Sequence, residues 1–245
     1  KKGFKGNVIT TSATVELCEV MLPDSGHIQE TECERKNKKY LRRGQPLIEP
    51  IYTAAEASNC LKYFKRVDYD NIIEIDDTLK FCFRNSGHIL GSAMIELYIK
   101  ENKQKFKVVF SGDIGNRNQP IIKDPYLLEQ ADYLIIESTY GNKIHEIKDR
   151  LKKRDTLKEI IIKALKKGGN IIVPAFAVER TQDLLVELNY LLRTGDLPNF
   201  QIIIDSPLAI AATEIFQRHH QYFSDAVAEL NQNGEKALIF ENIKF

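Results

Sequence analysis

The chain has 245 residues, of which 43% are hydrophobic and 28% charged, a composition that allows a sizeable core in one large domain or two ordinary ones. The formal net charge of +1 neither indicates nor excludes a nucleic-acid partner, because a basic groove can lie on a neutral protein. No run approaches 18 uncharged apolar residues, so we expect no membrane span, and we recognise no signal peptide.

The four cysteines are scattered along the chain and form no CxxC pair. Three of them lie in periodic apolar segments, where free core thiols are expected, so a reducing cytoplasm is a simpler interpretation than a disulfide framework. The chain begins with Lys1-Lys2-Gly3 instead of Met and ends abruptly at Phe245. We therefore expect it to be part of a longer protein.

The chain opens with a predicted strand, Val8–Thr10, followed by a predicted helix, Ser12–Leu22. Pro23-Asp24-Ser25-Gly26 is expected to end this helix, because proline and glycine interrupt helical hydrogen bonding. The segment Glu34–Arg43 carries six basic residues and predicts an irregular, solvated loop. A strip that contacts phosphate is the alternative interpretation of this segment.

A second helix is predicted from Thr53 to about Phe64, since Glu56 stands three positions after Thr53 as in a capping box. From Asn71 to Gly112 the apolar period changes to two, which is typical of β-strands. The four expected strands are Ile73–Ile75, Leu79–Phe83, Ala93–Ile99 and Phe106–Phe110, with a hairpin turn at Glu101–Gln104 and a further, buried strand at Asp132–Ile136.

After Tyr140-Gly141-Asn142 the pattern becomes an alternation of helices and strands. Alternation of this length implies a parallel sheet with crossover helices. The change near residue 141 is the predicted domain boundary. The expected helices are Glu146–Lys167, Glu179–Leu192 and Ala209–His219, and the expected strands are Asn170–Pro174 and Gln201–Asp205.

Two glycine-rich turns follow predicted strands, and each carries one side chain that can bind a metal. His88 lies in Ser86–Ser92 ("SGHILGS") and Asp113 lies in Ser111–Gly115 ("SGDIG"). Glycines let the backbone approach a site closely, and an imidazole with a carboxylate suits Zn²⁺ or Mn²⁺. On these residues alone, a structural histidine and a simple turn are the more common interpretations.

Glu137 follows four apolar residues at the end of another predicted strand. A carboxylate in that place is costly unless it is paired, and it could pair a metal-binding histidine. The alternative is a turn formed by Glu137-Ser138-Thr139.

Six segments in this order resemble the β-CASP family of metallo-β-lactamase-fold nucleases, which includes the endonuclease subunit of the eukaryotic cleavage and polyadenylation machinery. The resemblance covers essentially the whole chain and implies an α/β fold. Residues 1–140 would form part of a metallo-β-lactamase αββα sandwich, and residues 141–245 an inserted, incomplete β-CASP α/β domain with a parallel sheet. The segments are Gly3–Thr14, Leu22–Glu30, Ser86–Ala93, Phe110–Asn116, Asp132–Glu146, and Gly168–Leu185 with Ile202–Ala209.

The same resemblance implies roles for individual residues. His88 would bind one metal, Asp113 would bridge two metals and take part in catalysis, and Glu137 would be the acid of motif A in the proton-transfer network. Each of four further positions has a structural alternative to a role in substrate contact. These positions are His27, His145, Arg180 and Ser206.

The resemblance implies two Zn²⁺ ions in the intact protein, with Mn²⁺ as the alternative, and a metal-activated hydroxide that attacks the phosphodiester. The substrate would be single-stranded RNA, with DNA as the alternative, and the enzyme would be a cytoplasmic RNA-processing exonuclease or endonuclease with no membrane partner and a homodimer as one candidate assembly. The family's HxHxDH motif and its motifs B and C are absent from the sequence. This chain alone is therefore expected to bind metal weakly or not at all, and to be inactive.

Other interpretations stay open beside the nuclease. A non-catalytic RNA-binding relative in an RNA-processing complex is one, although intact His88 and Asp113 argue against a degenerate site. Another is a metallo-β-lactamase-fold hydrolase of thioesters or lactams, although such enzymes lack an α/β insert like residues 141–245. The third is a folding fragment without activity of its own.

Overall fold

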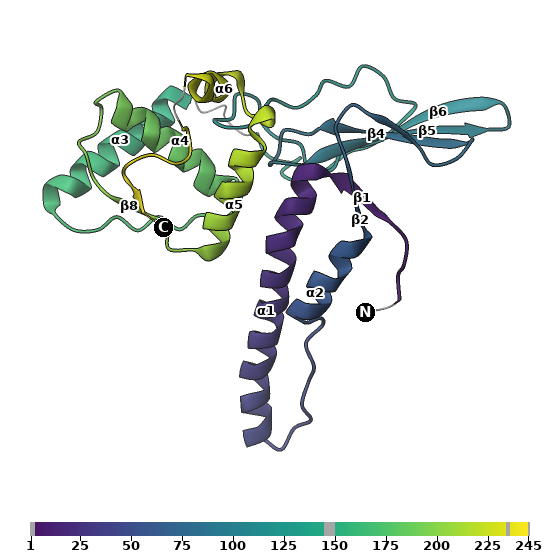
Figure 1. Cartoon of the computed structure of the whole chain (residues 1–245), viewed down its shortest axis with the longest axis horizontal. Coiled ribbons are helices and arrows are strands. Elements are labelled where there is room, and N and C mark those ends of the chain that lie inside the picture. Colours follow the sequence, from purple (N-terminus) through teal and green to yellow (C-terminus); the bar gives the residue numbers. More distant parts are fainter. Residues whose placement is uncertain (1–2, 145–149, 234–235, 245) are drawn as a thin grey trace. The chain divides into compact units, whose positions relative to one another are not determined.

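A computed structural model describes residues 3–144, 150–233 and 236–244 of the chain, which divides into two compact units, residues 1–71 and 72–245 (Figure 1). The first unit contains β1 (Val8–Thr11), α1 (Ser12–Arg42), α2 (Ala54–Cys60), a 3₁₀ turn (Leu61–Tyr63) and β2 (Phe64–Val67). The second contains β3 (Ile72–Glu74), β4 (Leu79–Asn85), β5 (Ala93–Glu101), β6 (Gln104–Phe110), β7 (Tyr133–Ile135), α3 (Arg150–Lys167), α4 (Arg180–Arg193), β8 (Ile202–Ile203), α5 (Pro207–Arg218), a 3₁₀ turn (His220–Tyr222), α6 (Asp225–Gln232) and β9 (Ile243–Lys244). The predicted domain boundary near residue 141 lies inside the second unit and stays a prediction. None of the helices in the described ranges has both the length and the apolar character needed to cross a membrane.

The first unit is a parallel pair, β1 with β2, joined by two helices. The predicted capping box at the start of α2 is confirmed: Thr53 Oγ1 accepts a hydrogen bond from Glu56 N, and Glu56 Oε2 accepts one from Thr53 N. The helix is shorter than expected and passes through a 3₁₀ turn into β2, a strand that the sequence did not predict. Phe64 is therefore a strand residue rather than the end of the helix.

Helix α1 runs through the segment where the sequence predicted its end, with Pro23 in its interior. The expected stop is wrong because Gly26 serves a helix contact instead. A Cβ atom on Gly26 would lie 2.6 Å from Ala54 Cα, so only glycine lets the two segments approach this closely. Ser25 and Tyr52 share a hydrogen bond of 2.7 Å beside this contact. This packing keeps α1 helical beyond Pro23, a residue that lacks a backbone N–H and so costs the helix one hydrogen bond.

The segment Glu34–Arg43 is the end of α1 and its C-cap, not the expected irregular loop. Its buried side is fixed by the chain that follows: Asn37 Oδ1 accepts from Ile48 N at 2.9 Å, and Asn37 Nδ2 donates to Ile48 O at 2.8 Å. Cys33 Sγ donates to the same carbonyl oxygen. The charged side chains occupy the other, exposed side of the helix.

The second unit begins with a five-stranded sheet in the order β3-β4-β5-β6-β7. The first four strands are antiparallel, as their period of two predicted, and β7 joins β6 in parallel. The turn between β5 and β6 is confirmed, with positive φ angles at Asn102 and Lys103 that suit a tight hairpin. The strand predicted at Asp132–Ile136 forms as β7 at the edge of the sheet, but its apolar side chains are exposed on both faces. The expected burial of this strand is wrong within the described chain.

A buried carboxylate, that of Glu96, lies on β5, the central strand of this sheet. Glu96 is 1% exposed, and its two oxygens receive Arg84 Nε at 2.8 Å and Lys107 Nζ at 2.5 Å. Tyr98 also donates its hydroxyl to Glu96. Burial opposes ionisation of Glu96, but these hydrogen bonds outweigh burial and lower its pKa from the ordinary value.

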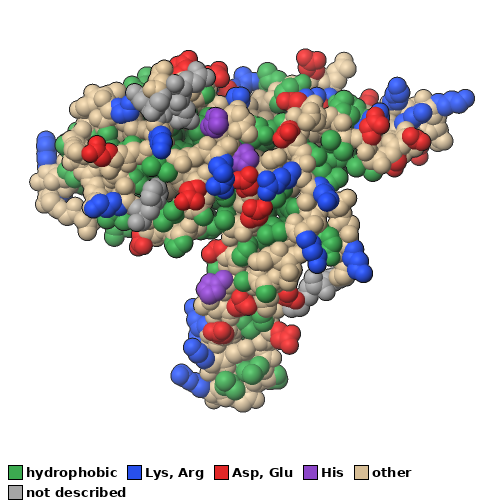
Figure 2. Space-filling model, viewed as in Figure 1, with side chains coloured by type: hydrophobic (Ala, Val, Ile, Leu, Met, Phe, Trp, Pro, Cys, Tyr) green, Lys and Arg blue, Asp and Glu red, His purple; other side chains and the backbone are tan. Residues whose placement is uncertain are grey.

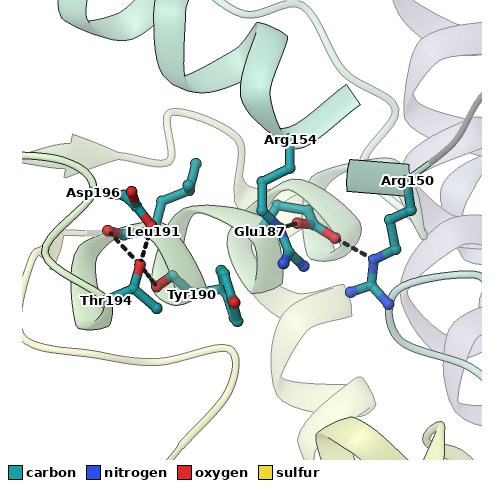
Figure 3. Close-up of polar contacts among 7 residues, drawn as sticks. All are labelled: Arg150, Arg154, Glu187, Tyr190, Leu191, Thr194 and Asp196. Carbon is teal, nitrogen blue, oxygen red and sulfur yellow. Dashed lines mark hydrogen bonds and ion pairs between the residues drawn. The ribbon is translucent and has the colours of Figure 1, made fainter. Parts of the chain in front are cut away.

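Helices α3 and α4 pack through an apolar cluster that includes Ile161, Leu188, Leu191 and Leu197. Charged contacts flank this cluster, as Figure 3 shows: Glu187 accepts from Arg150 Nε at 2.7 Å and from Arg154 Nε at 2.5 Å. The guanidinium of Arg154 also lies 3.7 Å from the ring centre of Tyr190. The sequence predicted both helices, while the strand expected at Asn170–Pro174 does not form and leaves Ile172 89% exposed. The short β8 pairs in parallel with β9, which the sequence did not predict.

Candidate functional site

The turn that carries His88 is organised around Ser92. The hydroxyl of Ser92 accepts hydrogen bonds from the backbone N–H groups of His88 and Ile89 and from the hydroxyl of Ser86. Asn85, the last residue of β4, accepts from Gly87 N through Oδ1 at 2.9 Å. The two serines of the motif therefore close the loop and hold the His88 backbone at the end of the strand.

The turn that carries Asp113 packs directly on the first one. Gly115 N donates to Ser86 O at 2.9 Å. Gly87 and Gly112 both have positive φ angles, which glycine adopts without strain. Because β4 and β6 are both neighbours of β5, their ends bring the two turns to one edge of the sheet.

The two predicted metal-binding side chains meet at this edge. His88 Nε2 lies 3.8 Å from Asp113 Oδ2, and the side chains are 43% and 69% exposed. A nitrogen and an oxygen at this separation, facing one another and open to solvent, have the chemistry and the spacing to share a cation.

The third predicted residue, Glu137, joins the same cluster from the end of β7. Its Oε1 accepts from Ile114 N, the residue after Asp113, and its own N–H donates to Ser111 Oγ at 3.0 Å. Ser111 N in turn donates to Ile135 O. Glu137 is thus bound to both sides of the Asp113 turn, and its carboxylate is paired with backbone and not left alone in the apolar environment.

The four residues expected to contact substrate lie on other elements or outside the described ranges, and their role stays a prediction. His27 is exposed on α1, in the other unit. Arg180 starts α4, is 65% exposed and pairs with Asp183 at 3.7 Å. Ser206 caps α5, where its Oγ accepts from Ala209 N. His145 lies outside the described residues.

The donor set fits a divalent metal by type, since imidazole nitrogen and carboxylate oxygen are ordinary ligands of zinc and manganese. The described residues contain no group of three or more His, Cys, Asp or Glu side chains able to hold a metal. Zinc sites use three or four protein ligands. His88 and Asp113 are therefore a partial ligand set.

The sequence did not predict that Glu179 contacts the His88 turn. Glu179 Oε2 accepts from Leu90 N at 3.0 Å and so links the His88 turn to the start of α4. The sequence offered no signal for this contact, because Glu179 was expected only as the first residue of a helix and stands 89 positions away from its partner.

A comparison with protein families matches residues 181–245 to the Beta-Casp domain. The chain is 30% identical over 93% of its length to Ribonuclease TTHA0252 from Thermus thermophilus, and 36% identical over 74% to Probable RNase MJ4 from Methanocaldococcus jannaschii. It is 28% identical over 94% to transcription termination factor FttA from Lokiarchaeum sp.. The chain spans 46%, 39% and 34% of these three proteins, less than half of each.

The matched domain lies in the part of the chain where the helices and strands alternate. The relatives extend the similarity over the strand-end turns of His88 and Asp113 as well. The mixed sheet, its glycine-rich turns and the α/β segment follow one another along the chain in the same order as the segments that resemble the family. The chain therefore belongs to the β-CASP family of metallo-β-lactamase-fold proteins.

Proposed function

We propose that the protein containing this chain is a metal-dependent ribonuclease. The observation that carries the proposal is the 3.8 Å separation of His88 Nε2 and Asp113 Oδ2 on two packed turns. The names of the relatives, two of them ribonucleases, support RNA as the substrate. The alternatives are a non-catalytic RNA-binding relative and another hydrolase of the metallo-β-lactamase fold.

In this proposal His88 and Asp113 hold two zinc ions together with ligands from outside the chain, and manganese is the alternative metal. A bound metal pair supplies an acidified water for attack on phosphorus and positive charge that offsets the charge on the phosphoryl oxygens. The chain alone binds metal weakly or not at all, because two protein ligands are fewer than a zinc site uses.

The part of Glu137 in the proposal is to fix the position of Asp113. Its Oε1 holds Ile114 N, and its backbone N–H holds Ser111 Oγ, so the Asp113 turn is tied on both sides. A carboxylate fixed in this way also stands beside the site as an acceptor in a proton-transfer network.

Single-stranded RNA is the proposed class of substrate, and DNA is the alternative. The cytoplasm is the proposed location, and the free state of Cys18, Cys33, Cys60 and Cys82 supports it. The choice between exonuclease and endonuclease and the assembly as a homodimer stay predictions.

The test uses the intact protein and measures bound metal together with cleavage of an end-labelled single-stranded RNA. Asp113→Ala is expected to lower the metal content and to reduce cleavage at least a hundredfold. Asp77→Ala is the matched control, because Asp77 is exposed in the turn before β4, at the strand end opposite to His88.

Equal metal content and equal cleavage in Asp113→Ala would contradict the proposal. An intact wild-type protein that binds RNA but holds no metal and cuts nothing would establish the non-catalytic alternative. Cleavage of a thioester or lactam in place of RNA would establish the other hydrolase.

A further inference from the structure

Glu179 occupies a backbone conformation that is rare for any residue with a side chain. Its φ and ψ angles are 70° and −59°, and Arg180 N donates to Val178 O at 3.0 Å across it. This is the γ-turn with positive φ, which is strained and uncommon. Strain of this kind costs on the order of 1–3 kcal/mol and persists where the surrounding structure requires it.

The strained turn directs a buried carboxyl group toward the His88 turn. Glu179 is 5% exposed. Its Oε2 accepts from Leu90 N at 3.0 Å, and its Oε1 has no hydrogen-bond partner among the described residues. Leu90 is 2% exposed and stands two residues after His88. The contact therefore lies under the turn and away from solvent.

We propose that Glu179 is a positioning residue that holds the His88 turn in its metal-binding geometry from the start of α4. The inference rests on the proposed function, since it gives a purpose to a fixed His88. Burial, followed by the charge of Asp183, raises the pKa of Glu179 to about 8, so the carboxyl group is largely neutral at pH 7. Glutamine is then its closest replacement in shape, charge and acceptor capacity.

The test compares Glu179→Gln, Glu179→Gly and Glu179→Ala in the intact protein. Glycine removes both the strain and the hydrogen bond, alanine removes only the hydrogen bond, and glutamine keeps the acceptor. The readouts are metal affinity, amide hydrogen exchange of the peptide spanning residues 84–94, and the melting temperature. Glu214→Ala, an exposed glutamate on α5, is the control.

We expect Glu179→Gly to weaken metal binding about tenfold, in the range seen for groups that orient a ligand, and to speed amide exchange in the turn. Its melting temperature should stay close to that of the wild type, because relief of the strained φ offsets the loss of the hydrogen bond to Leu90 N. Glu179→Gln should restore metal affinity to within about threefold of the wild type. A role in stability alone predicts the reverse, a lower melting temperature with unchanged metal affinity and exchange.

Wild-type metal affinity and turn exchange in Glu179→Gly and Glu179→Ala would overturn the inference while leaving the ribonuclease proposal intact. A wild-type protein without metal and without RNA cleavage would instead overturn the proposed function, and the exchange of residues 84–94 would still report whether Glu179 holds the turn.

A second, independent observation concerns the end of α1. Six exposed cations lie between residues 35 and 43, with no anion among them: Arg35, Lys36, Lys38, Lys39, Arg42 and Arg43. Their spacings of three, four and seven place residues 35, 38 and 42 in one row and residues 36, 39 and 43 in the next. This basic face lies opposite to Cys33 and Asn37, which contact Ile48.

The basic face is poorly neutralised by the protein itself. Among the described residues, its one ion pair joins Lys36 to Glu32 at 3.8 Å, with both side chains 52% exposed. Figure 2 shows Lys and Arg side chains gathered near the end of the long helix. Two rows of long, mobile cations suit the phosphate backbone of a nucleic acid. We infer that the basic face binds the phosphates of the RNA substrate, an inference that also rests on the proposed function.

The test measures RNA affinity of the intact protein across salt concentrations for the triple substitution Arg35→Gln, Lys38→Gln and Arg42→Gln. Each lost phosphate contact should lower the slope of log affinity against log salt by about 0.7, so three should lower it by about 2, with KM raised and kcat unchanged. Lys163→Gln, Lys166→Gln and Lys167→Gln on α3 are the matched control, all exposed in the second unit.

A wild-type salt slope in the triple variant would overturn the inference and assign the basic face to another partner, such as an acidic protein surface. Absence of RNA binding by the wild type at low salt would overturn the proposed function instead. The double substitution Arg35→Lys and Arg42→Lys, which keeps the charge, should retain the wild-type slope.

Discussion

Gly115 and Gly87 lie so close together that a Cβ atom on Gly115 would be 1.6 Å from the carbonyl oxygen of Gly87. A Cβ atom is fixed to the backbone, so no side-chain rotation can relieve its clash with the carbonyl oxygen. The contact is therefore what allows the His88 turn and the Asp113 turn to share one edge of the sheet. It ties a sequence feature, glycine in both motifs, to the 3.8 Å separation of the two candidate ligands.

Gly115→Ala should push the two turns apart. We expect a loss of about 3 kcal/mol in the free energy of unfolding, at the upper end for overpacking, together with loss of metal binding. Thermal unfolding and metal content of the intact protein check both effects. Gly168→Ala is the control: Gly168 also has a positive φ of 68°, but nothing lies within 4 Å of its Cβ position, so only the strain of about 1–2 kcal/mol applies. Equal effects of the two substitutions would show that the contact with Gly87 is unimportant.

The sheet and the three strand-end residues were predictable because each depends on a local pattern. A period of two predicted the strands between Leu79 and Phe110, and the structure supplies their pairing, which brings the ends of β4 and β6 together. The ends of α1 and the strand at Asn170–Pro174 were not predictable in this way. Gly26 stands where a helix stop would stand, and only the chain folded back from residue 53 shows that it makes a contact.

The contact of Glu179 lay beyond sequence analysis for a different reason. Its partner is a backbone N–H, which any residue at position 90 would provide, so no pair of residue types marks it. The positive φ of Glu179 could not be predicted from the sequence either, because glutamate has no preference for that conformation. The substrate role expected of His27, Arg180 and Ser206 stays a prediction. In the structure Arg180 pairs with Asp183, and Ser206 caps α5.

The stability of the second unit should fall as pH rises from about 5 to about 8. Burial is the main cause that raises the pKa of Glu179 to about 8 and of Asp183 to about 6. A carboxyl group whose pKa is higher in the folded state stays protonated there while the unfolded chain has already lost its proton. Its stabilising effect is complete below the unfolded pKa, about 4, and is lost as pH passes the folded value.

Several charged groups change the pKa values of Glu179 and Asp183. Arg180 lowers the pKa of both carboxyl groups, Glu187 raises that of Asp183, and Arg150 and Lys153 lower it. Thermal unfolding at pH 5.5 and pH 8.5 checks the prediction, with Glu179→Gln plus Asp183→Asn as the comparison. The double variant should lose much of the pH dependence between these values. An equal pH dependence in both proteins would assign it to other groups.

Glu96 provides the last prediction, on the sheet that carries the candidate site. Glu96→Ala leaves Arg84 and Lys107 without their carboxylate, in places where their side chains are only 18% and 24% exposed. Removing one partner of a buried ion pair costs about 3–5 kcal/mol, and we expect a value near 3 because both cations retain some contact with water. Glu96→Gln keeps the volume and the acceptor of Tyr98, so its loss should be smaller. Denaturant titration of the intact protein measures both values.

The exposed pair of Lys80 with Glu74 is the matched control on the same sheet, since the Glu74 side chain is 67% exposed. Glu74→Gln should cost less than about 1 kcal/mol. The order expected is therefore Glu96→Ala, then Glu96→Gln, then Glu74→Gln, from the largest loss to the smallest. A Glu96→Ala protein as stable as Glu74→Gln would mean that Arg84 and Lys107 find water or new partners, and that the sheet does not depend on its buried carboxylate.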